Sequence, residues 1–216
     1  MNTILKKHWT DSHNAYKEIK YPYIMVKFKI VNNELTIAKT ITKLDQFAFD
    51  VIDVLKKYTN YVIISGYVSI FFGRSRATED IDMFIDEIKY DKFLKMYNEF
   101  IAKGFEFTID NPAKLYNDYL TSNIPINIWR KDLPLLRMEI KIARKTSQKL
   151  ILNNPIKVNV NDREIFFSKI ESQIAYKRYI SASEKDLEDA RHLEIVFEDI
   201  DKEKIKYYKR IFEKDK

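Results

Sequence analysis

The sequence predicts an α/β fold of the α+β kind, in which a small, mixed, twisted sheet carries flanking helices and is followed by a helical part. Three observations predict it. Several short segments alternate apolar and polar residues with the period of a strand. Longer segments between them place apolar residues at helical spacing. Gly66 stands between an apolar run and a short helical run, where a strand turns sharply into a helix.

Length and composition bound the class of protein. The chain has 216 residues, which suits one domain with an appendage or two small domains. Hydrophobic residues make up 45% and charged residues 32%, enough for a core and a soluble surface. No apolar run reaches the length that crosses a bilayer, and the N-terminus lacks the apolar stretch of a signal peptide. We therefore expect a cytoplasmic protein with no membrane partner; the sequence does not give the oligomeric state.

The residue inventory restricts the chemistry. The chain has no cysteine, which excludes disulfides, thiolate zinc sites and cysteine nucleophiles. With only three histidines, a catalytic metal would be held mainly by carboxylates, which indicates Mg²⁺ or Mn²⁺. The net charge of +6 is compatible with a polyanionic partner such as RNA or a nucleotide, and also with a merely lysine-rich surface.

The N-terminal part, residues 1–58, is predicted to pack on the core as a hairpin and a helix. Residues 23–40 alternate, with a turn signal at Asn32-Asn33, which predicts a β-hairpin. Thr42 is a candidate N-cap for a helix that reaches Tyr58.

The core is predicted at residues 59–150. Period-2 patterns and short apolar runs predict strands at 61–65, 80–85, 105–108, 124–129 and 135–142. Helical spacing predicts helices at 68–72 and 90–103, with a helical piece after Pro112.

A C-terminal part is predicted at residues 151–216. It contains a small hairpin at 156–167 and helices that start near Ser168, Ser183 and Asp201. Ser168 with Glu171, and Ser183 with Asp186, have the spacing of helix caps.

Residues 62–85 carry the strongest chemical signal. Gly66 at a strand-to-helix turn lets backbone N–H groups approach phosphates. Asp80 and Asp82 lie two residues apart on a strand and point to the same side, so they are able to share metal ions, while Ile81 faces the core. Hydroxyl and basic groups that would hold phosphates stand nearby, at Ser69, Arg74, Arg76 and Thr78.

This stretch resembles the polymerase-beta-type nucleotidyltransferase superfamily and, within it, the minimal and AbiEii-like toxin nucleotidyltransferases. Those proteins carry a strand, a Gly-Gly or Gly-Ser turn, a short helix, a glycine, Arg-x-Thr and then Asp-x-Asp on a strand. The matching residues are Gly66, Gly73, Arg76, Thr78, Asp80 and Asp82. The resemblance implies the nucleotidyltransferase fold and a nucleoside triphosphate bound with Mg²⁺ or Mn²⁺. It assigns Asp80 and Asp82 to the metal and Gly66, Ser69, Arg74, Arg76 and Thr78 to the phosphates.

One position departs from the pattern. Tyr67 stands where the family has Gly or Ser. A bulky residue there is expected to crowd the phosphates or to remove a hydroxyl contact, which Ser65 or Ser69 would then supply.

The superfamily also uses a third carboxylate on a later strand, and the matching residue is Glu139. The resemblance implies that Glu139 completes the metal site and accepts the proton of the attacking hydroxyl. Lys141 shares its face and would meet a phosphate. In the alternative interpretation, Arg137, Glu139 and Lys141 are the solvated side of a sheet.

A second similarity to the AbiEii-like group lies between Ser168 and Asp189. In that group a Lys-Asp pair followed by a further Asp lies near the nucleotide site, and Lys185, Asp186 and Asp189 match it. Lys185 and Asp189 are four residues apart and share a helix face. The alternative is that capping explains the serines and acids, and that Lys177 is a solvated helix residue.

Three functions follow. The first is a nucleotidyltransferase that moves a nucleoside monophosphate from a triphosphate to an acceptor hydroxyl. The acceptor would be tRNA or another RNA in a toxin-like protein with an antitoxin partner; a protein or a small molecule such as an aminoglycoside stays open. The second is a nucleotide-binding module of the same fold with little or no turnover, and the third is a basic RNA-binding protein.

Overall fold

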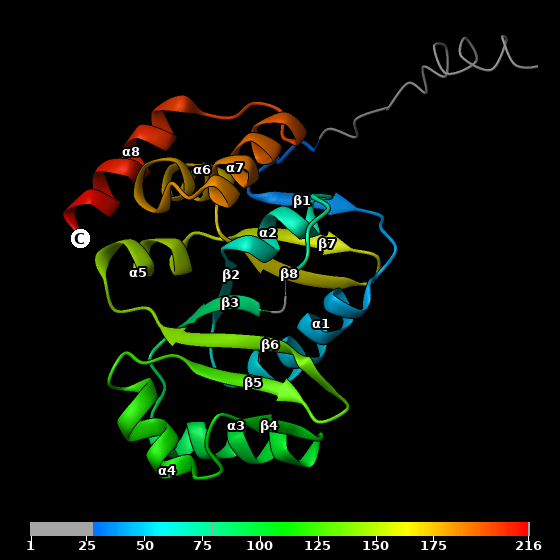
Figure 1. Ribbon diagram of the computed structural model, residues 1–216, viewed down its shortest axis with the longest axis vertical. Helices are drawn as coiled ribbons and strands as arrows, with labels where there is room; N and C mark the ends of the chain where they lie inside the picture. Colours follow the sequence, from blue (N-terminus) through cyan, green and yellow to red (C-terminus); the bar gives the residue numbers. More distant parts are fainter. Residues whose placement is uncertain (1–27, 79, 216) are drawn as a thin grey trace, which may run out of the picture.

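The computed structural model describes residues 28–78 and 80–215 and has a mixed α/β fold (Figure 1). One sheet has the strand order β1-β7-β8-β2-β3-β6-β5-β4. The strands are β1 (Glu34–Ile37), β2 (Tyr61–Ile64), β3 (Asp80–Ile85), β4 (Phe105–Phe107), β5 (Ile126–Arg130), β6 (Leu133–Ile142), β7 (Ile156–Val160) and β8 (Arg163–Phe167). The pairs β1–β7, β8–β2 and β3–β6 are parallel and the others antiparallel, so the mixed sheet that the sequence predicts is confirmed.

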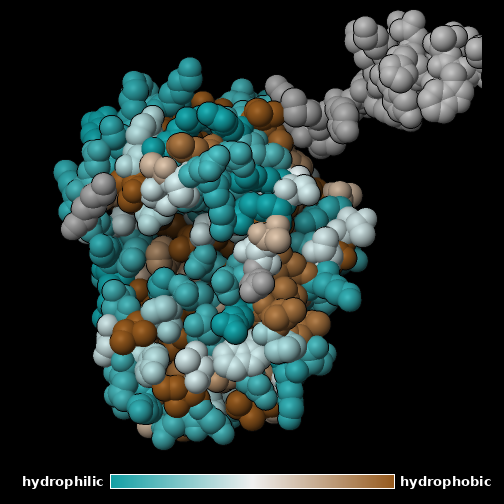
Figure 2. Space-filling model, viewed as in Figure 1, coloured by the Kyte–Doolittle hydropathy of each residue, from teal (hydrophilic) through white to brown (hydrophobic). Residues whose placement is uncertain are grey.

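The helices cover the sheet and its two ends. They are α1 (Lys43–Leu55), α2 (Gly66–Phe71), α3 (Tyr90–Ala102), α4 (Pro112–Lys114), α5 (Thr146–Asn153), α6 (Ile170–Tyr176), α7 (Glu184–Val196) and α8 (Lys202–Lys214). Two π-helical segments, η1 (Leu115–Leu120) and η2 (Lys177–Ser181), continue α4 and α6. Helices α6, α7 and α8 gather at one end of the molecule and α3 and α4 at the other (Figure 1). The face seen in that view is mostly hydrophilic (Figure 2).

The two central parallel strands separate a core face from a polar face. In β3, Ile81 and Met83 are buried, while Asp80 is exposed and Asp82 half-buried. In β6, alternate residues are buried in the same way, from Met138 to Ile142. Helix α1 packs against β6, and α5 packs against β2 and β3. The strand alternation in the sequence therefore places the carboxylates on one side of the sheet.

Local caps define several helix starts. Thr42 caps α1, and its backbone N–H in turn donates to the Asp45 carboxylate at 2.8 Å. Ser183 caps α7 by accepting from the Asp186 N–H, as predicted. The cap predicted at Ser168 is wrong, because α6 begins after Lys169 and the Ser168 hydroxyl accepts from the Gln173 side chain instead.

The hairpin predicted at 23–40 is only partly present among the described residues; residues 23–27 lie outside them. The turn is confirmed, since Asn32 and Asn33 both have positive φ and Val31 bridges Glu34. The pairing is wrong, because β1 runs parallel to β7. Phe28 bridges Phe197, and its ring packs on Phe72 and Phe197 at centroid distances of 5.3 and 5.5 Å. Burial of this aromatic ring directs residues 28–30 toward the C-terminal helices.

The sheet takes strands from all three predicted parts of the chain. Strand β1 comes from the N-terminal part, and the hairpin β7–β8 comes from the C-terminal part and joins the same sheet. The boundary predicted at residue 150 falls inside α5, a helix that the sequence did not predict. Among the described residues, no helix is long and apolar enough to span a membrane.

Candidate functional site

The turn from β2 into α2 is held in an unusual backbone conformation. Ser65 has φ 64° and ψ −143°. This region of backbone space is occupied almost only by glycine, and a side chain held there costs about 1–3 kcal/mol. Ser65 directly follows Ile64, the register partner of Asp82 on the neighbouring strand, and both Ser65 and Asp82 line the same cavity. Strain of this kind clusters at functional sites, so it marks the turn as a candidate site.

The carboxylates of β3 and β6 lie beside this turn. Asp82 is the direct register partner of Glu139, and Asp80 lies one strand repeat away on the same side of β3. Burial raises the pKa of the Asp82 carboxyl above its ordinary value; the Ser65 hydroxyl opposes this, and the charge of Glu139 adds to it. The site therefore crowds negative charge at its centre.

Lysine neutralises part of this charge. The Lys141 Nζ lies 2.5 Å from the Glu139 Oε1. Within residues 28–78 and 80–215, no three histidine, cysteine or acidic residues are placed to hold a metal ion together. The expected trio of Asp80, Asp82 and Glu139 is therefore not preassembled, because Glu139 is ion-paired. Asp80 and Asp82 keep the same-side arrangement that suits a shared hard cation.

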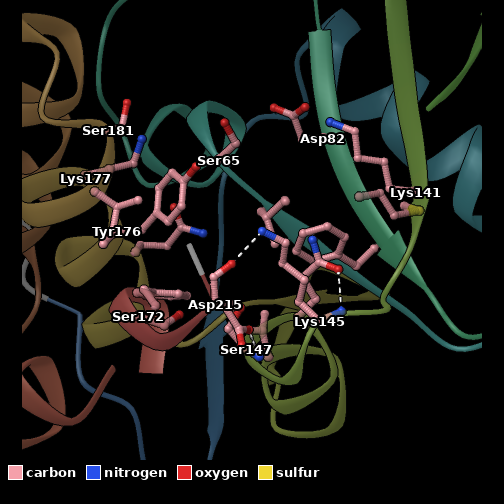
Figure 3. A pocket seen from close by; sticks show the side chains of 18 of the residues that line it. Ser65, Asp82, Lys141, Lys145, Ser147, Ser172, Tyr176, Lys177, Ser181 and Asp215 are labelled. Carbon is pink, nitrogen blue, oxygen red and sulfur yellow. Dashed lines mark hydrogen bonds between the residues drawn. The ribbon is translucent and has the colours of Figure 1, made fainter. Parts of the chain in front are cut away.

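A cavity of about 480 Å³ opens in front of these residues (Figure 3). Strands β3 and β6 supply Asp82, Glu139 and Lys141 to its wall, and the turn between β2 and α2 supplies Ser65. Across the cavity, α6 and η2 supply Ser172, Tyr176, Lys177 and Ser181, and Lys145, Ser147 and Asp215 lie between the two sides (Figure 3). The cavity thus lies between a charged part of the sheet face and a wall of helices.

A buried ion network lies beside the cavity, in the wall between α2 and α7. The Asp189 carboxylate is fully buried. It accepts from Arg76 through both oxygens, at 3.1 and 3.2 Å, from Lys177 at 2.8 Å, and also from Arg74. Arg74 donates further to Glu188 and to the Lys185 carbonyl. Asp189 therefore gathers three cations next to the candidate site.

Gly66 makes room for one of these cations. A methyl group on its Cα would overlap the guanidinium of Arg76. The glycine at this turn therefore allows a close approach of the arginine, in addition to the phosphate approach that the sequence suggested.

The structure gives the remaining predicted residues different places. Ser69 is fully buried, and its hydroxyl has no hydrogen-bond partner in the described part of the chain. Thr78 donates to the Asp80 carbonyl at 3.1 Å. The Lys185 side chain is exposed and lies outside the cavity wall, and Asp189 lies behind that wall and holds cations. Ser65, Asp82, Glu139 and Lys141 are the members of the predicted set that line the cavity.

Tyr67 does not crowd this site. Its side chain is fully buried, and its hydroxyl donates to the Asp45 carboxylate at 2.7 Å. The expectation that it obstructs the phosphates is wrong, because the first turn of α2 directs the ring into the core toward α1.

The alternative interpretation, in which Lys177 is a solvated helix residue, is wrong. Its side chain is 2% exposed and donates to Asp186 at 3.0 Å as well as to Asp189. The signal was in the sequence: Lys177 follows Ile170 and Ile174 at helical spacing, which places it on the buried face. Tyr176, Lys145 and Asp215 are further cavity residues that the sequence analysis missed, since distant segments bring them together.

Several chains of solved structures are similar to this chain, and two of them are described here. No family model matches the chain, and no curated protein matches it. The lincosamide antibiotic adenylyltransferase LnuA, in a lincomycin-bound crystal structure, is 15% identical with a TM-score of 0.47, over 73% of this chain and 99% of that chain. The antibiotic-resistance factor ANT(2'')-Ia is 12% identical with a TM-score of 0.48, over 81% and 94% of the two chains. Because these values are low, the functional assignment rests on the residues of the site.

Proposed function

We propose that this chain is a nucleotidyltransferase. It transfers a nucleoside monophosphate from a nucleoside triphosphate to an acceptor hydroxyl, releases pyrophosphate, and depends on Mg²⁺ or Mn²⁺. The observation that carries the proposal is the strained Ser65 turn next to Asp82, at the wall of a cavity that also presents Glu139 and Lys141. A site of this kind combines carboxylates, cations and a tight turn, which phosphoryl transfer requires.

In this proposal Asp80 and Asp82 hold the metal ion, with Glu139 as the third carboxylate. Burial, together with the charge of Glu139, raises the pKa of Asp82, so a cation that stabilises the ionised carboxylate is favoured there. When bound, a divalent ion supplies neutralisation of phosphate charge and alignment of the attacking and leaving oxygens. Lys141 exchanges its contact with Glu139 for a phosphate oxygen, which frees the Glu139 carboxylate to take the proton of the acceptor hydroxyl.

The triphosphate is held by the turn and by the basic groups around it. The Ser65 hydroxyl and the Gly66 backbone face it from the turn, with Thr78 on the loop before β3. Ser69 is fully buried within α2 and would reach the triphosphate only if that helix moved. Arg74 and Arg76, fixed by Asp189, contribute positive charge at the edge of the site. Lys185 would reach the triphosphate only from outside the present cavity wall.

The acceptor is an RNA in the preferred form of the proposal. Basic residues recur along α8, whose exposed Tyr207 stands beside lysines. Positive charge next to an exposed aromatic ring suits a nucleic acid strand. In this form of the proposal the RNA is a tRNA, and the protein acts as a toxin with an antitoxin partner. The competing acceptor is a small hydroxylated molecule.

A second candidate is a nucleotide-binding module without turnover. The Glu139–Lys141 ion pair favours it, because this pair occupies the carboxylate that would accept the proton. Tyr67 gives it no support, since the ring points into the core.

The test is transfer of label from each α-labelled nucleoside triphosphate, with Mg²⁺ or Mn²⁺, to a total tRNA pool or to a hydroxylated antibiotic. The expected result is metal-dependent label on one acceptor class. It should be lost in the Asp80→Asn/Asp82→Asn variant and kept in Glu164→Gln, which removes an exposed carboxylate from β8 of the same sheet.

The outcomes separate the candidates. Metal-dependent nucleotide binding without label on any acceptor favours the module. Salt-sensitive RNA binding that survives the double aspartate substitution, with no nucleotide binding, favours a simple RNA-binding protein.

A further inference from the structure

The cavity has a helical wall that the proposed transfer chemistry leaves unused. Helix α6 and segment η2 supply Gln173, Tyr176 and Ile180 to it, Phe212 comes from α8, and Ile151 comes from α5. Tyr176, Ile180 and Phe212 give this wall apolar surface among its polar side chains, whereas the sheet face opposite carries Asp82, Glu139 and Lys141. The helical wall therefore supplies the aromatic and aliphatic surface that the sheet side of the cavity presents least.

Tyr176 presents an aromatic ring to this cavity. The residue is 48% exposed although it belongs to a packed helix. Its ring meets that of Phe212 edge-on, at a centroid distance of 5.5 Å and an interplanar angle of 83°. Phe212 therefore supports the ring by an edge contact, and Figure 3 shows the Tyr176 side chain among those that line the cavity. A supported and accessible ring suits a flat ligand.

Gln173 places a polar group beside that ring. It is 6% exposed and lines the cavity three residues before Tyr176. Its Nε2 donates to the Ser168 hydroxyl at 2.5 Å, which fixes the carboxamide. Among the described residues, its Oε1 has no hydrogen-bond partner. A carbonyl oxygen that is held in one position on a cavity wall is able to accept a hydrogen bond from a donor on the edge of a ligand.

We infer that Tyr176 and Gln173 form the nucleobase subsite of this cavity. The inference rests on the proposed function, because it seats the base of the same nucleotide whose phosphates meet Ser65 and Lys141. A nucleobase has an apolar face and a polar edge, which match a stacking ring and a fixed carbonyl. The Gln173 acceptor pairs with the exocyclic amino group of adenine or cytosine, so ATP and CTP are preferred over UTP.

The first test separates the base from the phosphates. Calorimetry with Mg²⁺ measures the binding of ATP, CTP, UTP and inorganic tripolyphosphate to the full chain. Tyr176→Ala should weaken the three nucleotides roughly 5- to 100-fold, the loss that removal of one base–aromatic stack gives. Tripolyphosphate, which has no base, should bind unchanged.

Two controls keep this test specific. Tyr176→Phe retains the ring and should bind all four ligands like the parent chain. Tyr179→Ala removes an exposed tyrosine of η2 that lies outside the cavity, and it should also leave binding unchanged. Equal losses in Tyr176→Ala for nucleotides and tripolyphosphate would overturn the stacking assignment.

The second test concerns the base edge. Gln173→Leu should abolish the preference for ATP and CTP over UTP, while Gln173→Glu, which keeps an acceptor, should retain it. Both substitutions also change the contact between residue 173 and Ser168. Thermal unfolding of both variants measures the effect of that change on stability separately from its effect on ligand binding. UTP binding as tight as that of CTP in the parent chain would contradict the role of Gln173.

Ligand binding to the parent chain also separates a failure of the base subsite from a failure of the proposed function. If it binds tripolyphosphate as tightly as ATP, the base subsite is wrong and the phosphate site stands. If it binds neither, the proposed function is wrong, and the base subsite with it.

Discussion

Ser65 shows how one residue can carry both strain and a functional contact. Its φ of 64° and ψ of −143° belong to a region where a Cβ is unfavourable, yet the sequence keeps a serine there. The hydroxyl opposes the rise in the pKa of Asp82 that burial causes. The residue therefore places a polar group next to this carboxylate, at the wall of the cavity, at the cost of an unfavourable backbone conformation.

Comparison of Ser65→Gly with Ser65→Ala isolates the strain, because both variants lose the hydroxyl. Glycine adopts this conformation freely and alanine does not, so Ser65→Gly should be more stable by about 1–2 kcal/mol. Urea unfolding measures the difference. The same two substitutions at Ser172, inside α6, should give the opposite order of stability. There Ser172→Ala should be the more stable variant, because glycine is less favourable than alanine in a helix by about 1 kcal/mol. Equal stability of the two Ser65 variants would argue against strain at this turn.

Tyr67 marks the limit of local sequence reasoning at the same scale. The sequence places Tyr67 next to the phosphate-type turn, and adjacency suggests crowding. The direction of the side chain depends on how α2 packs against α1, where the Asp45 carboxylate accepts from the Tyr67 hydroxyl, from Thr42 and from Lys39. No local pattern in the sequence contains that contact.

Tyr67→Phe should lower the free energy of unfolding by about 1.5–3 kcal/mol, the range for a buried hydrogen bond to a charged group. Burial tends to raise the pKa of Asp45, but the hydrogen bonds from Thr42, Tyr67 and Lys39 outweigh it and lower the pKa. The contribution of the ionised Asp45 to the free energy of unfolding is therefore complete at pH values above its ordinary pKa. It is lost as the pH falls through the lowered pKa. The difference between the variant and the parent should be larger at pH 7 than at pH 2, by urea unfolding.

Tyr207→Phe is the matched control, because it removes the hydroxyl of an exposed tyrosine. It should change the free energy of unfolding by less than about 0.5 kcal/mol. A Tyr67→Phe variant as stable as this control would mean that the contact with Asp45 contributes nothing.

At the scale of elements, the sequence predicted those whose signals are local. The Thr42–Asp45 cap of α1, the Ser183 cap of α7 and the alternation in β6 lie within a few residues of sequence. Helix α5 was missed because the carboxylate that accepts from its Ser147 N–H belongs to Asp215, 68 residues away. The partner of β1 was missed for the same reason, since β7 is distant in sequence.

The start of α7 should give a pH-dependent stability. Asp186 is partly buried, which would raise its pKa, but hydrogen bonds from Ser181, Ser183 and Lys177 lower the pKa to about 2. Its stabilising contribution is therefore complete above pH 4 and is lost as pH falls from about 4 to 2. The Tm of Asp186→Asn should lie below that of the parent chain at pH 6, and this gap should narrow across that window.

Circular dichroism melts between pH 6 and pH 2 measure this gap. Ser181→Ala and Ser183→Ala each remove one hydrogen bond to Asp186, so each should raise its pKa and move the loss of stability to higher pH. A gap that stays constant with pH would contradict the assigned role of Asp186.

At the scale of the whole molecule, Asp189 connects the sheet half to the helical half. Arg74 and Arg76 come from the loop between α2 and β3, and Lys177 comes from η2, whereas Asp189 belongs to α7. The sequence singled out Asp189 by resemblance and placed it near a nucleotide. Its role as a buried partner of three cations depends on the packing of three segments, which a single sequence does not reveal.

Asp189→Asn should destabilise the chain by about 3–5 kcal/mol, because it removes a charge partner from the buried Lys177 ammonium and from two arginines. In contrast, Glu188→Gln removes an exposed partner of Arg74 and should cost less than about 1 kcal/mol.

Lys177→Met in the Asp189→Asn background should recover part of the lost stability, since the buried ammonium is then absent. A double-mutant cycle by urea unfolding measures this coupling. Purely additive effects of the two substitutions would show that Lys177 and Asp189 do not act as a pair. A positive coupling would instead show that Lys177 and Asp189 stabilise the chain as a pair, across the contact between η2 and α7.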